Sequence, residues 1–143
     1  MIAPDWNLDE APPFVFHHIG YACRAIDKAR VPFEALGYRQ EGETFADPIQ
    51  GVAGCFLVGA GPRLELLENL SNSNTLTPWL DAGVSMYHFA YQVGRLDEGV
   101  EWARKRRGKL MAPAAPAVAF DGRPICFVML PGRLLIEFIQ GPA

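Results

Sequence analysis

Apolar and polar residues follow the same pattern twice along this chain. In the first half, strand-type alternation gives way to helix-type spacing and then returns to strand-type alternation. The predicted elements are a strand over 14–23, a helix over 24–36, and strands over 38–45, 51–58 and 63–69. Gly37 is the expected C-terminal cap of the helix, and Pro32 inside it predicts a kink or a break.

The second half restarts that order after a polar linker at 71–74 and a predicted short helix at 75–80. It then predicts a strand over 85–93, a helix over 96–107, an extended segment over 110–118, and strands over 125–130 and 133–139. Each half is therefore predicted to be βαβββ, which makes an α+β fold. Neither half is long enough to bury its own sheet well, so the two should pack as one domain.

We expect a domain over 14–140, with modules 14–70 and 85–140, a linker at 71–84, and an irregular N-terminal arm at 1–13. The whole chain has 143 residues, half of them hydrophobic, which is typical of a globular protein of one domain. The net charge of −3 offers no general attraction for nucleic acid or an anionic membrane surface. Apolar runs fall short of the roughly 20 residues that span a bilayer.

Targeting and redox signals indicate a cytoplasmic protein. The first residues lack the basic and apolar regions of a signal peptide. The three cysteines, Cys23, Cys55 and Cys126, are odd in number and lie in apolar, strand-like surroundings. Reduced thiols that serve as small core residues are therefore expected.

The repeat also carries candidate chemistry. The segment HIGYA (18–22) is echoed by HFAYQ (88–92), 70 residues later, and LEL (64–66) is echoed by IEF (136–138), 72 residues later. Each half thus contributes one histidine and one glutamate: His18 and Glu65, then His88 and Glu137. This set of donors is typical of a divalent metal site built across two modules.

Strand alternation supports that hypothesis. Each histidine would share a face with small or polar residues, as expected of a strand that lines a cavity. Each glutamate lies among apolar strand residues, where a buried carboxylate is costly unless it is paired or bound to metal. A lone strand histidine is more often structural, and a lone strand glutamate usually faces water, but the symmetric set of four favours one shared ion.

The segments that carry these residues resemble the vicinal oxygen chelate superfamily, which includes glyoxalase I, methylmalonyl-CoA epimerase, extradiol dioxygenases and the bleomycin and fosfomycin resistance proteins. The resemblance covers most of 14–140 and is strongest to the epimerase-like branch. It rests on HHIGYAC (17–23), QGV (50–52), LELLE (64–68), YHFAYQV (87–93), AFDGR (119–123) and LLIEFIQ (134–140). It implies two βαβββ modules whose mixed sheet curls around a metal cavity.

By position, the resemblance places the four metal ligands on His18, Glu65, His88 and Glu137. It implies one divalent ion per chain, which the ligand set leaves open among Zn, Mn, Co, Ni and Fe(II). It also implies a small-molecule substrate with a carbonyl or two chelating oxygens, and a homodimer. Extradiol dioxygenases use three protein ligands, so a fourth favours proton transfer over oxygen chemistry.

Glu137 is the expected catalytic base, and Glu65 the expected acid or base for the opposite face of the substrate. Asp121 and Arg123, in a turn that the repeat places near the cavity mouth, are candidate substrate-binding residues or a salt-bridged turn. His17, which precedes the first ligand, should point away from the metal, either in a structural role or as a residue that supports a ligand from outside the ligand set.

One position departs from the epimerase pattern. Gly54 stands where those enzymes carry a glutamate base. Epimerisation of methylmalonyl-CoA by two bases is therefore doubtful, and the glycine is expected to enlarge the cavity for a bulkier substrate.

Three functions stay open from the sequence. The first is a metal-dependent isomerase, epimerase or lyase that polarises a carbonyl and moves a neighbouring proton. The second is a small-molecule binding or sequestration protein on the same fold, which the missing base at Gly54 supports. The third is a metal-dependent oxygenase.

Overall fold

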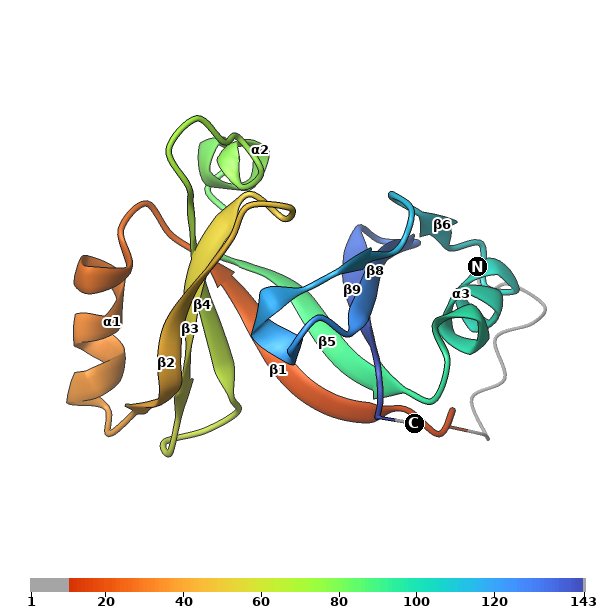
Figure 1. Ribbon diagram of the computed structural model, residues 1–143, viewed down its shortest axis with the longest axis horizontal. Coiled ribbons are helices and arrows are strands. Elements are labelled where there is room, and N and C mark those ends of the chain that lie inside the picture. The colour runs from red at the N-terminus through yellow and green to blue at the C-terminus, as the bar shows by residue number, and fades with distance from the viewer. Residues whose placement is uncertain (1–10, 143) are drawn as a thin grey trace.

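The computed structural model describes residues 11–142, and it confirms the α+β fold with two βαβββ modules. One strongly curled sheet, which does not close on itself, runs through the molecule in the order β2-β3-β4-β1-β5-β9-β8-β6, with β7 paired to β8. Figure 1 shows one module on each side, with α1 and α3 at opposite ends of the molecule. Among the described residues, no helix combines the length and apolar character needed to cross a membrane.

The first module has the predicted elements. They are β1 (Val15–Ala22), α1 (Ile26–Ala35), β2 (Arg39–Asp47), β3 (Val52–Val58) and β4 (Leu64–Asn69). β4 returns to lie parallel to β1, and β3 and β2 follow outward as antiparallel neighbours. The helix continues through Pro32, so of the kink or break expected at that residue, the break does not occur.

The second module repeats this arrangement with one difference. Its elements are β5 (Met86–Val93), α3 (Leu96–Arg104), β6 (Lys109–Leu110), β7 (Ala115–Pro116), the 3-10 turn η1 (Val118–Phe120), β8 (Pro124–Leu130) and β9 (Leu134–Gln140). The single extended segment predicted over 110–118 is two short strands, because its prolines cannot donate to a continuous ladder. Between the modules, α2 (Thr77–Asp81) fills part of the predicted linker.

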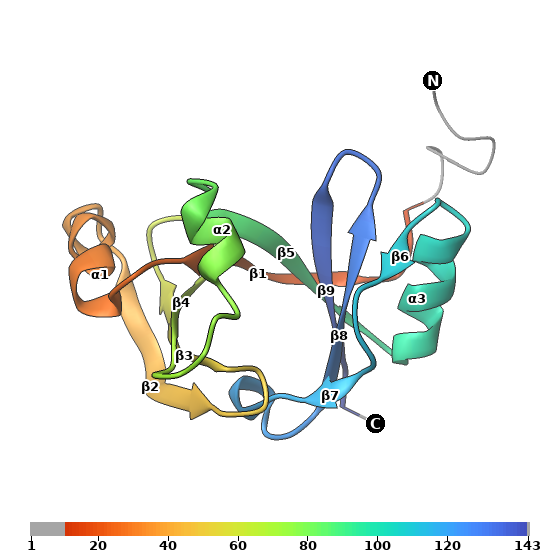
Figure 2. The same cartoon turned by 90° about the horizontal axis from the view of Figure 1, so that it is seen from above.

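The modules join through β1 and β5, which pair antiparallel at the centre of the sheet. This pairing puts the concave faces of both modules on the same side. At the open side of the curl, the buried carboxylate of Asp47 at the end of β2 accepts the backbone N–H of Val118 in η1, at 2.9 Å. Figure 2 shows the end of β2 lying beside the second module at this point, so the second module helps to cover the first.

Each helix covers the convex face of its own module. α1 packs over a cluster that includes Cys55, Leu57 and Leu66, and α3 packs over one that includes Cys126 and Phe138. The three cysteines are free and buried, as predicted. The expected arm at 1–13 lies outside the described residues except for 11–13.

The close approach of α3 to the sheet depends on Gly99. A Cβ at this position would lie 2.7 Å from the ring of Phe138, which is fully buried. Replacement of a glycine by alanine inside a helix ordinarily stabilises the helix by up to about 1 kcal/mol. Here we expect it to destabilise the protein by about 1–3 kcal/mol, because the buried ring must move.

Urea unfolding followed by circular dichroism measures this change, with Glu101→Ala on the exposed side of α3 as the control. Equal or greater stability of Gly99→Ala would show that the helix and sheet are not in contact at this point.

Candidate metal centre

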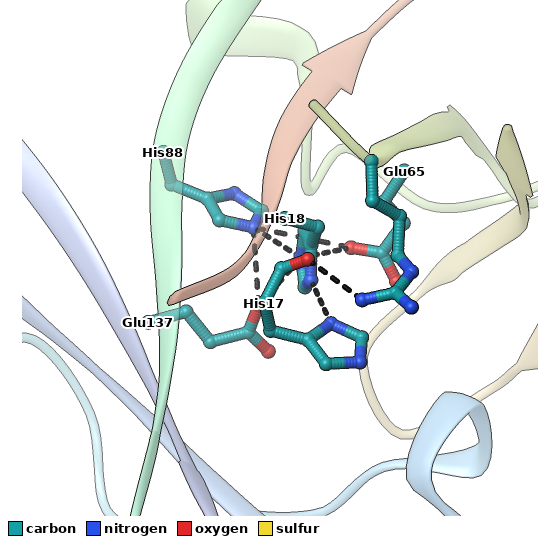
Figure 3. Close-up of polar contacts among 6 residues, drawn as sticks. His17, His18, Glu65, His88 and Glu137 are labelled. Atoms are coloured by element: carbon teal, nitrogen blue, oxygen red, sulfur yellow. Dashed lines mark hydrogen bonds and ion pairs between the residues drawn. The ribbon is translucent and has the colours of Figure 1, made fainter. Parts of the chain in front are cut away.

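The side chains of His18, Glu65, His88 and Glu137 converge on the concave face of the sheet. Each offers one ligand atom, and these four atoms all lie within 4.8 Å of one another. All four residues are buried, and His18 is fully enclosed. Figure 3 shows them reaching toward a common point from strands of both modules.

Sheet register explains why they meet. One row across β3, β4, β1 and β5 aligns Phe56, Glu65, Gly20 and His88. A second row across β8, β9, β5 and β1 aligns Phe127, Glu137, Ala90 and His18. Each row therefore consists of a phenylalanine, a glutamate, a small residue and a histidine, so the site is two copies of one row related by the repeat.

The small residue in each row makes room for an imidazole. A Cβ on Gly20 would lie 2.0 Å from Cε1 of His88, inside the volume of the ring. The row therefore requires glycine at this position for His88 to reach the centre. Ala90, at the equivalent place beneath His18, is fully buried.

The distances fit a divalent ion. His18 Nε2 lies 3.0 Å from a Glu65 oxygen, 3.2 Å from a Glu137 oxygen and 3.2 Å from His88 Nε2. His88 Nε2 lies 3.1 Å from Glu137 and 3.9 Å from Glu65. Ligand atoms at about 2.1 Å from one ion lie about 3.0 Å apart when adjacent in an octahedron, and about 4.2 Å apart when opposite.

An unsatisfied buried oxygen supports this fit. Oε1 of Glu137 is buried and makes no hydrogen bond, although it lies close to both imidazole Nε2 atoms. Such an atom is costly unless something at the centre binds it. Nitrogen and carboxylate donors also suit a divalent transition metal, so the four residues could hold such an ion.

The site is charged even without an ion. Burial would lower the pKa of His18, but the negative charges of Glu65 and Glu137 beside its ring outweigh burial and raise that pKa to about 9. Burial would raise the pKa of Glu137, but the imidazoles of His18 and His88 outweigh it and lower that pKa to about 2. A proton on His18 thus takes the place of a cation between the carboxylates.

His17 is the first residue whose position strand alternation predicts wrongly. The register of β1 against β5 shifts between Phe16 and His18, so His17 is an extra residue in a bulge. Its ring packs against Phe56 and Phe120 and lies behind His18, with the two Nδ1 atoms 2.8 Å apart.

This contact orients the imidazole of His18, the first candidate ligand. Burial, and then the nearby charges of His18 and Arg63, lower the pKa of His17 to about 4, so its ring is neutral at pH 7. A neutral Nδ1 of His17 can accept the N–H of His18 Nδ1, which leaves His18 Nε2 free for an ion. His17 therefore supports a ligand from behind and does not reach the four ligand atoms.

A matching irregularity precedes the second histidine. The register shifts again between Gly20 and Tyr21, which makes Tyr87 the extra residue on β5. Its ring meets His88 edge-on, with centroids 4.5 Å apart, and lines the cavity. Tyr87 stands at the position equivalent to His17, and Nδ1 of His88 is buried without a hydrogen-bond partner.

Several lining residues were missed by the sequence reasoning. Phe56 contacts the ring of His18, and Phe127 contacts the ring of His88, at centroid distances of 5.4 and 5.2 Å. A signal existed: Cys55-Phe56 recurs 71 residues later as Cys126-Phe127. Phe120, which stacks on His18 with its ring 6.0 Å away, had no such echo because it lies in η1.

The remaining predicted residues lie elsewhere. Asp121 is exposed, and Arg123 donates to the backbone carbonyls of Phe120 and Gln140, so these contacts give no support to a substrate role. A Cβ on Gly54 would lie 2.6 Å from the ring of Phe45 and 2.7 Å from Leu67. The expectation that this glycine enlarges the cavity is therefore wrong, because Phe45 fills the space.

A cavity of about 160 Å³ leads to the centre. Glu65, His88 and Glu137 form its polar floor. The fold and site together define a protein of two βαβββ modules with a concave site suited to a divalent ion. Residues 17–127 match the Glyoxalase/Bleomycin resistance protein/Dioxygenase superfamily, and the chain belongs to it.

Individual proteins are similar to this chain in sequence or in structure. Mitochondrial methylmalonyl-CoA epimerase of Bos taurus is 23% identical over 141 residues, which cover 96% of this chain and 77% of the relative. A hypothetical protein from Bacillus halodurans has a similar structure, with a TM-score of 0.76 and 24% identity over 92% of this chain and 97% of its own. Methylmalonyl-CoA epimerase from Mycobacterium tuberculosis has a TM-score of 0.72 and 21% identity over 90% and 89% of the two chains.

Gly20→Ala should remove metal binding without a change at any ligand. The added methyl group occupies the position of the His88 ring, so we expect the affinity for Zn²⁺ to fall at least about 100-fold, in the upper range for changes next to ligands. Competition with a chromophoric chelator measures the affinity. Gly94→Ala is the control, since its Cβ would lie no closer than 3.5 Å to any neighbour. Unchanged affinity in Gly20→Ala would place His88 outside the site.

Metal binding should also release protons. Because the raised pKa of His18 keeps its imidazole protonated at pH 7, an ion must displace that proton. We expect calorimetry in buffers of different ionisation enthalpy to report release of about one proton per Zn²⁺ at pH 7, and affinity to rise toward pH 9. Heats that do not depend on the buffer would show that His18 is neutral before the ion binds.

The same shifts set the stability of the metal-free protein. The pKa of His18 is raised from its ordinary value of 6.5 to about 9 in the folded protein, so protonation of His18 stabilises the fold. This contribution is complete below pH 6.5 and is lost as the pH rises through about 9. The pKa of Glu137 is lowered from 4.5 to about 2 in the folded protein, so ionisation of Glu137 stabilises the fold. This contribution is complete above pH 4.5 and is lost as the pH falls through about 2. Urea midpoints of metal-free protein should therefore fall from pH 6.5 to 9, and added Zn²⁺ should remove that fall.

Proposed function

We propose that this protein is a divalent-metal-dependent isomerase, epimerase or lyase, with one ion per chain held by His18, Glu65, His88 and Glu137. The observation that carries the proposal is the convergence of four buried donors at the floor of a cavity, with Oε1 of Glu137 unsatisfied. Membership of the superfamily and similarity to methylmalonyl-CoA epimerases support the same reaction type. The metal remains one of Zn, Mn, Co, Ni and Fe(II).

When bound, such an ion supplies a Lewis acid that polarises a substrate carbonyl and acidifies the C–H beside it. The residues of the chain then have separate tasks. Glu137 and Glu65 line the cavity from different modules, so a substrate at the floor lies within reach of both carboxylates. In this proposal Glu137 takes the proton from the C–H beside the carbonyl, and Glu65 acts as the acid or base on the opposite face of the substrate.

The aromatic side chains around the site lower its polarity. Phe120 covers His18, and Phe56 and Phe127 flank the imidazoles, so water is excluded from behind the ligands. In a site of low polarity, a bound ion would polarise a carbonyl more strongly. His17 holds the orientation of His18 while this chemistry proceeds.

Gly54 limits which member of this class the protein can be. The space above it is occupied by Phe45 and Leu67, and the third acidic residue of the cavity wall, Asp47, has its oxygens engaged by the N–H groups of Gln50 and Val118. No free third carboxylate therefore lines the cavity among the described residues. Proton transfer would depend on the two ligand glutamates alone. The separate base that the epimerases carry at position 54 is missing, which disfavours the methylmalonyl-CoA reaction itself.

A binding protein without turnover is the second candidate, and the missing glutamate at position 54 favours it. An oxygenase is the third candidate. The fourth protein ligand counts against an oxygenase, since it occupies a position that oxygen would need.

Metal content and isotope exchange together test the proposal. Elemental mass spectrometry of protein purified without chelator or nickel resin should find about one divalent ion per chain, lost in His88→Ala. Gln92→Ala, on the same strand, is the control and should keep the ion. Absence of any ion, even after reconstitution, would refute the proposal.

Exchange of deuterium from solvent into α-carbonyl compounds and acyl-CoA thioesters then measures proton transfer, by nuclear magnetic resonance. We expect exchange by the wild type, and a loss of about 10²-fold or more in Glu137→Gln preparations whose metal content is intact. Glu101→Gln, on an exposed face, is the matched control. A bound ion with no exchange on any compound would favour the binding protein.

We also propose that two copies form a dimer, as proteins of this superfamily often do, and that the protein is cytoplasmic. Light scattering after size-exclusion chromatography measures the mass in solution, and a mass near 15.8 kDa would refute the dimer.

A further inference from the structure

The wall of the cavity above the four ligand atoms is almost entirely apolar. Aromatic rings form much of it, together with aliphatic side chains on both sides of the curl. The aromatic members are Phe45, Trp79, Tyr87, Phe120 and Phe127, and the aliphatic ones include Val52, Leu67, Ile125 and Leu135. A substrate that reaches the floor must therefore place the rest of its reacting part against hydrocarbon.

No lysine or arginine lines this cavity in the part of the chain that the structure describes. Two arginines that lie close in sequence to residues of the site are engaged elsewhere: Arg63 binds Glu41 and the carbonyl of His17, and Arg123 binds two backbone carbonyls. The other polar groups of the wall are neutral or satisfied. Thr75 donates to the carbonyl of Gln50, and the oxygens of Asp47 accept two backbone N–H groups.

The charge balance at the floor of the cavity also disfavours an anionic group on the substrate. Two carboxylates, Glu65 and Glu137, neutralise one divalent ion, so the loaded site has no excess positive charge to offer. A second anionic group on the substrate, away from the chelating oxygens, would lose its water and meet no cation. Burial of an unpaired charge of this kind is strongly unfavourable.

The space is also small and defined by packed rings. Its volume is about 160 Å³, and Phe45 closes the side that Gly54 would otherwise open. Trp79 and Tyr87 contact each other, with ring centroids 5.5 Å apart, and so brace one another in the wall. A planar aryl group or a short branched alkyl group matches such a wall, because it buries apolar area without polar atoms to satisfy.

We propose that the site takes a substrate whose two chelating oxygens are attached to a compact, uncharged apolar body, such as an aryl or branched-alkyl α-hydroxy ketone or a related carbonyl compound. This inference rests on the proposed metal site for the chelating oxygens. It goes beyond the proposed reaction because it excludes a free carboxylate or phosphate on the part of the substrate inside the cavity.

Binding of a matched pair of chelators tests this directly, without any need for turnover. Benzohydroxamate presents two oxygens on a neutral ring, and its 4-carboxy derivative adds one anionic group to the same ring. We expect calorimetry on Zn²⁺-loaded protein to give a Kd for benzohydroxamate at least about 10-fold below that of the 4-carboxy compound, given the cost of an unpaired buried charge. Equal affinities, or tighter binding of the 4-carboxy compound, would overturn the proposal.

A variant that adds a cation to the wall provides the converse test. Gln50 lines the cavity, is half-buried and lies in the turn between β2 and β3. Gln50→Arg should narrow the ratio of the two Kd values at least about 5-fold, since hydrogen bonds to charged groups are stronger than those between neutral groups. Gln50→Met, of similar length without charge, should leave the difference unchanged. No change in Gln50→Arg would argue against the missing cation as the cause.

The two proposals fail in different ways. Preference for benzohydroxamate with no isotope exchange on any substrate would refute the proton-transfer function and keep this inference. Should the protein bind no ion, acetophenone and 4-acetylbenzoate titrated into metal-free protein still compare a neutral with an anionic body. Tighter binding of acetophenone would support the neutral wall, and equal binding would overturn it.

Discussion

The antiparallel pairing of β1 with β5 is the constraint on which both the sheet and the site depend. It sets Gly20 opposite His88 and His18 opposite Ala90, so each histidine lies over a small residue of the other module. The parallel neighbours β4 and β9 then bring Glu65 and Glu137 into the same two rows. Neither module alone contains a centre, since each supplies one histidine and one glutamate to a pair of rows that only their pairing completes.

The concentration of ionisable groups at this centre has consequences for stability. Two buried carboxylates and two buried imidazoles must share protons or an ion, because each unpaired charge there would cost several kcal/mol. In the metal-free protein the elevated pKa of His18 and the lowered pKa of Glu137 describe the first solution, a proton held between carboxylates. A divalent ion held by the four residues would replace that proton, so metal binding and folding would be coupled through the same side chains.

Much of the fold followed from local patterns. Alternation located the strands, helical spacing located α1 and α3, and the repeat showed that the modules are equivalent. The errors arose where local patterns are weakest: Pro32 did not break α1, and the extended stretch after α3 divided into β6, β7 and η1. In the site, alternation assigned His17 to the wrong face because a bulge is a property of strand pairing and has no mark in the local alternation.

The sequence by itself determined which residues are available for chemistry, because a histidine and a glutamate repeated at equivalent strand positions identify themselves without any knowledge of contacts. It also determined that small residues accompany each histidine. Only the tertiary structure decided what those residues face. The ring of Phe45 over Gly54, the support of His18 by His17 and the cover of Phe120 all join residues from strands or turns distant in the chain. Such contacts depend on register and curl, which arise when the whole sheet forms, so a repeat in one dimension could not specify the apolar, cation-free wall of the cavity.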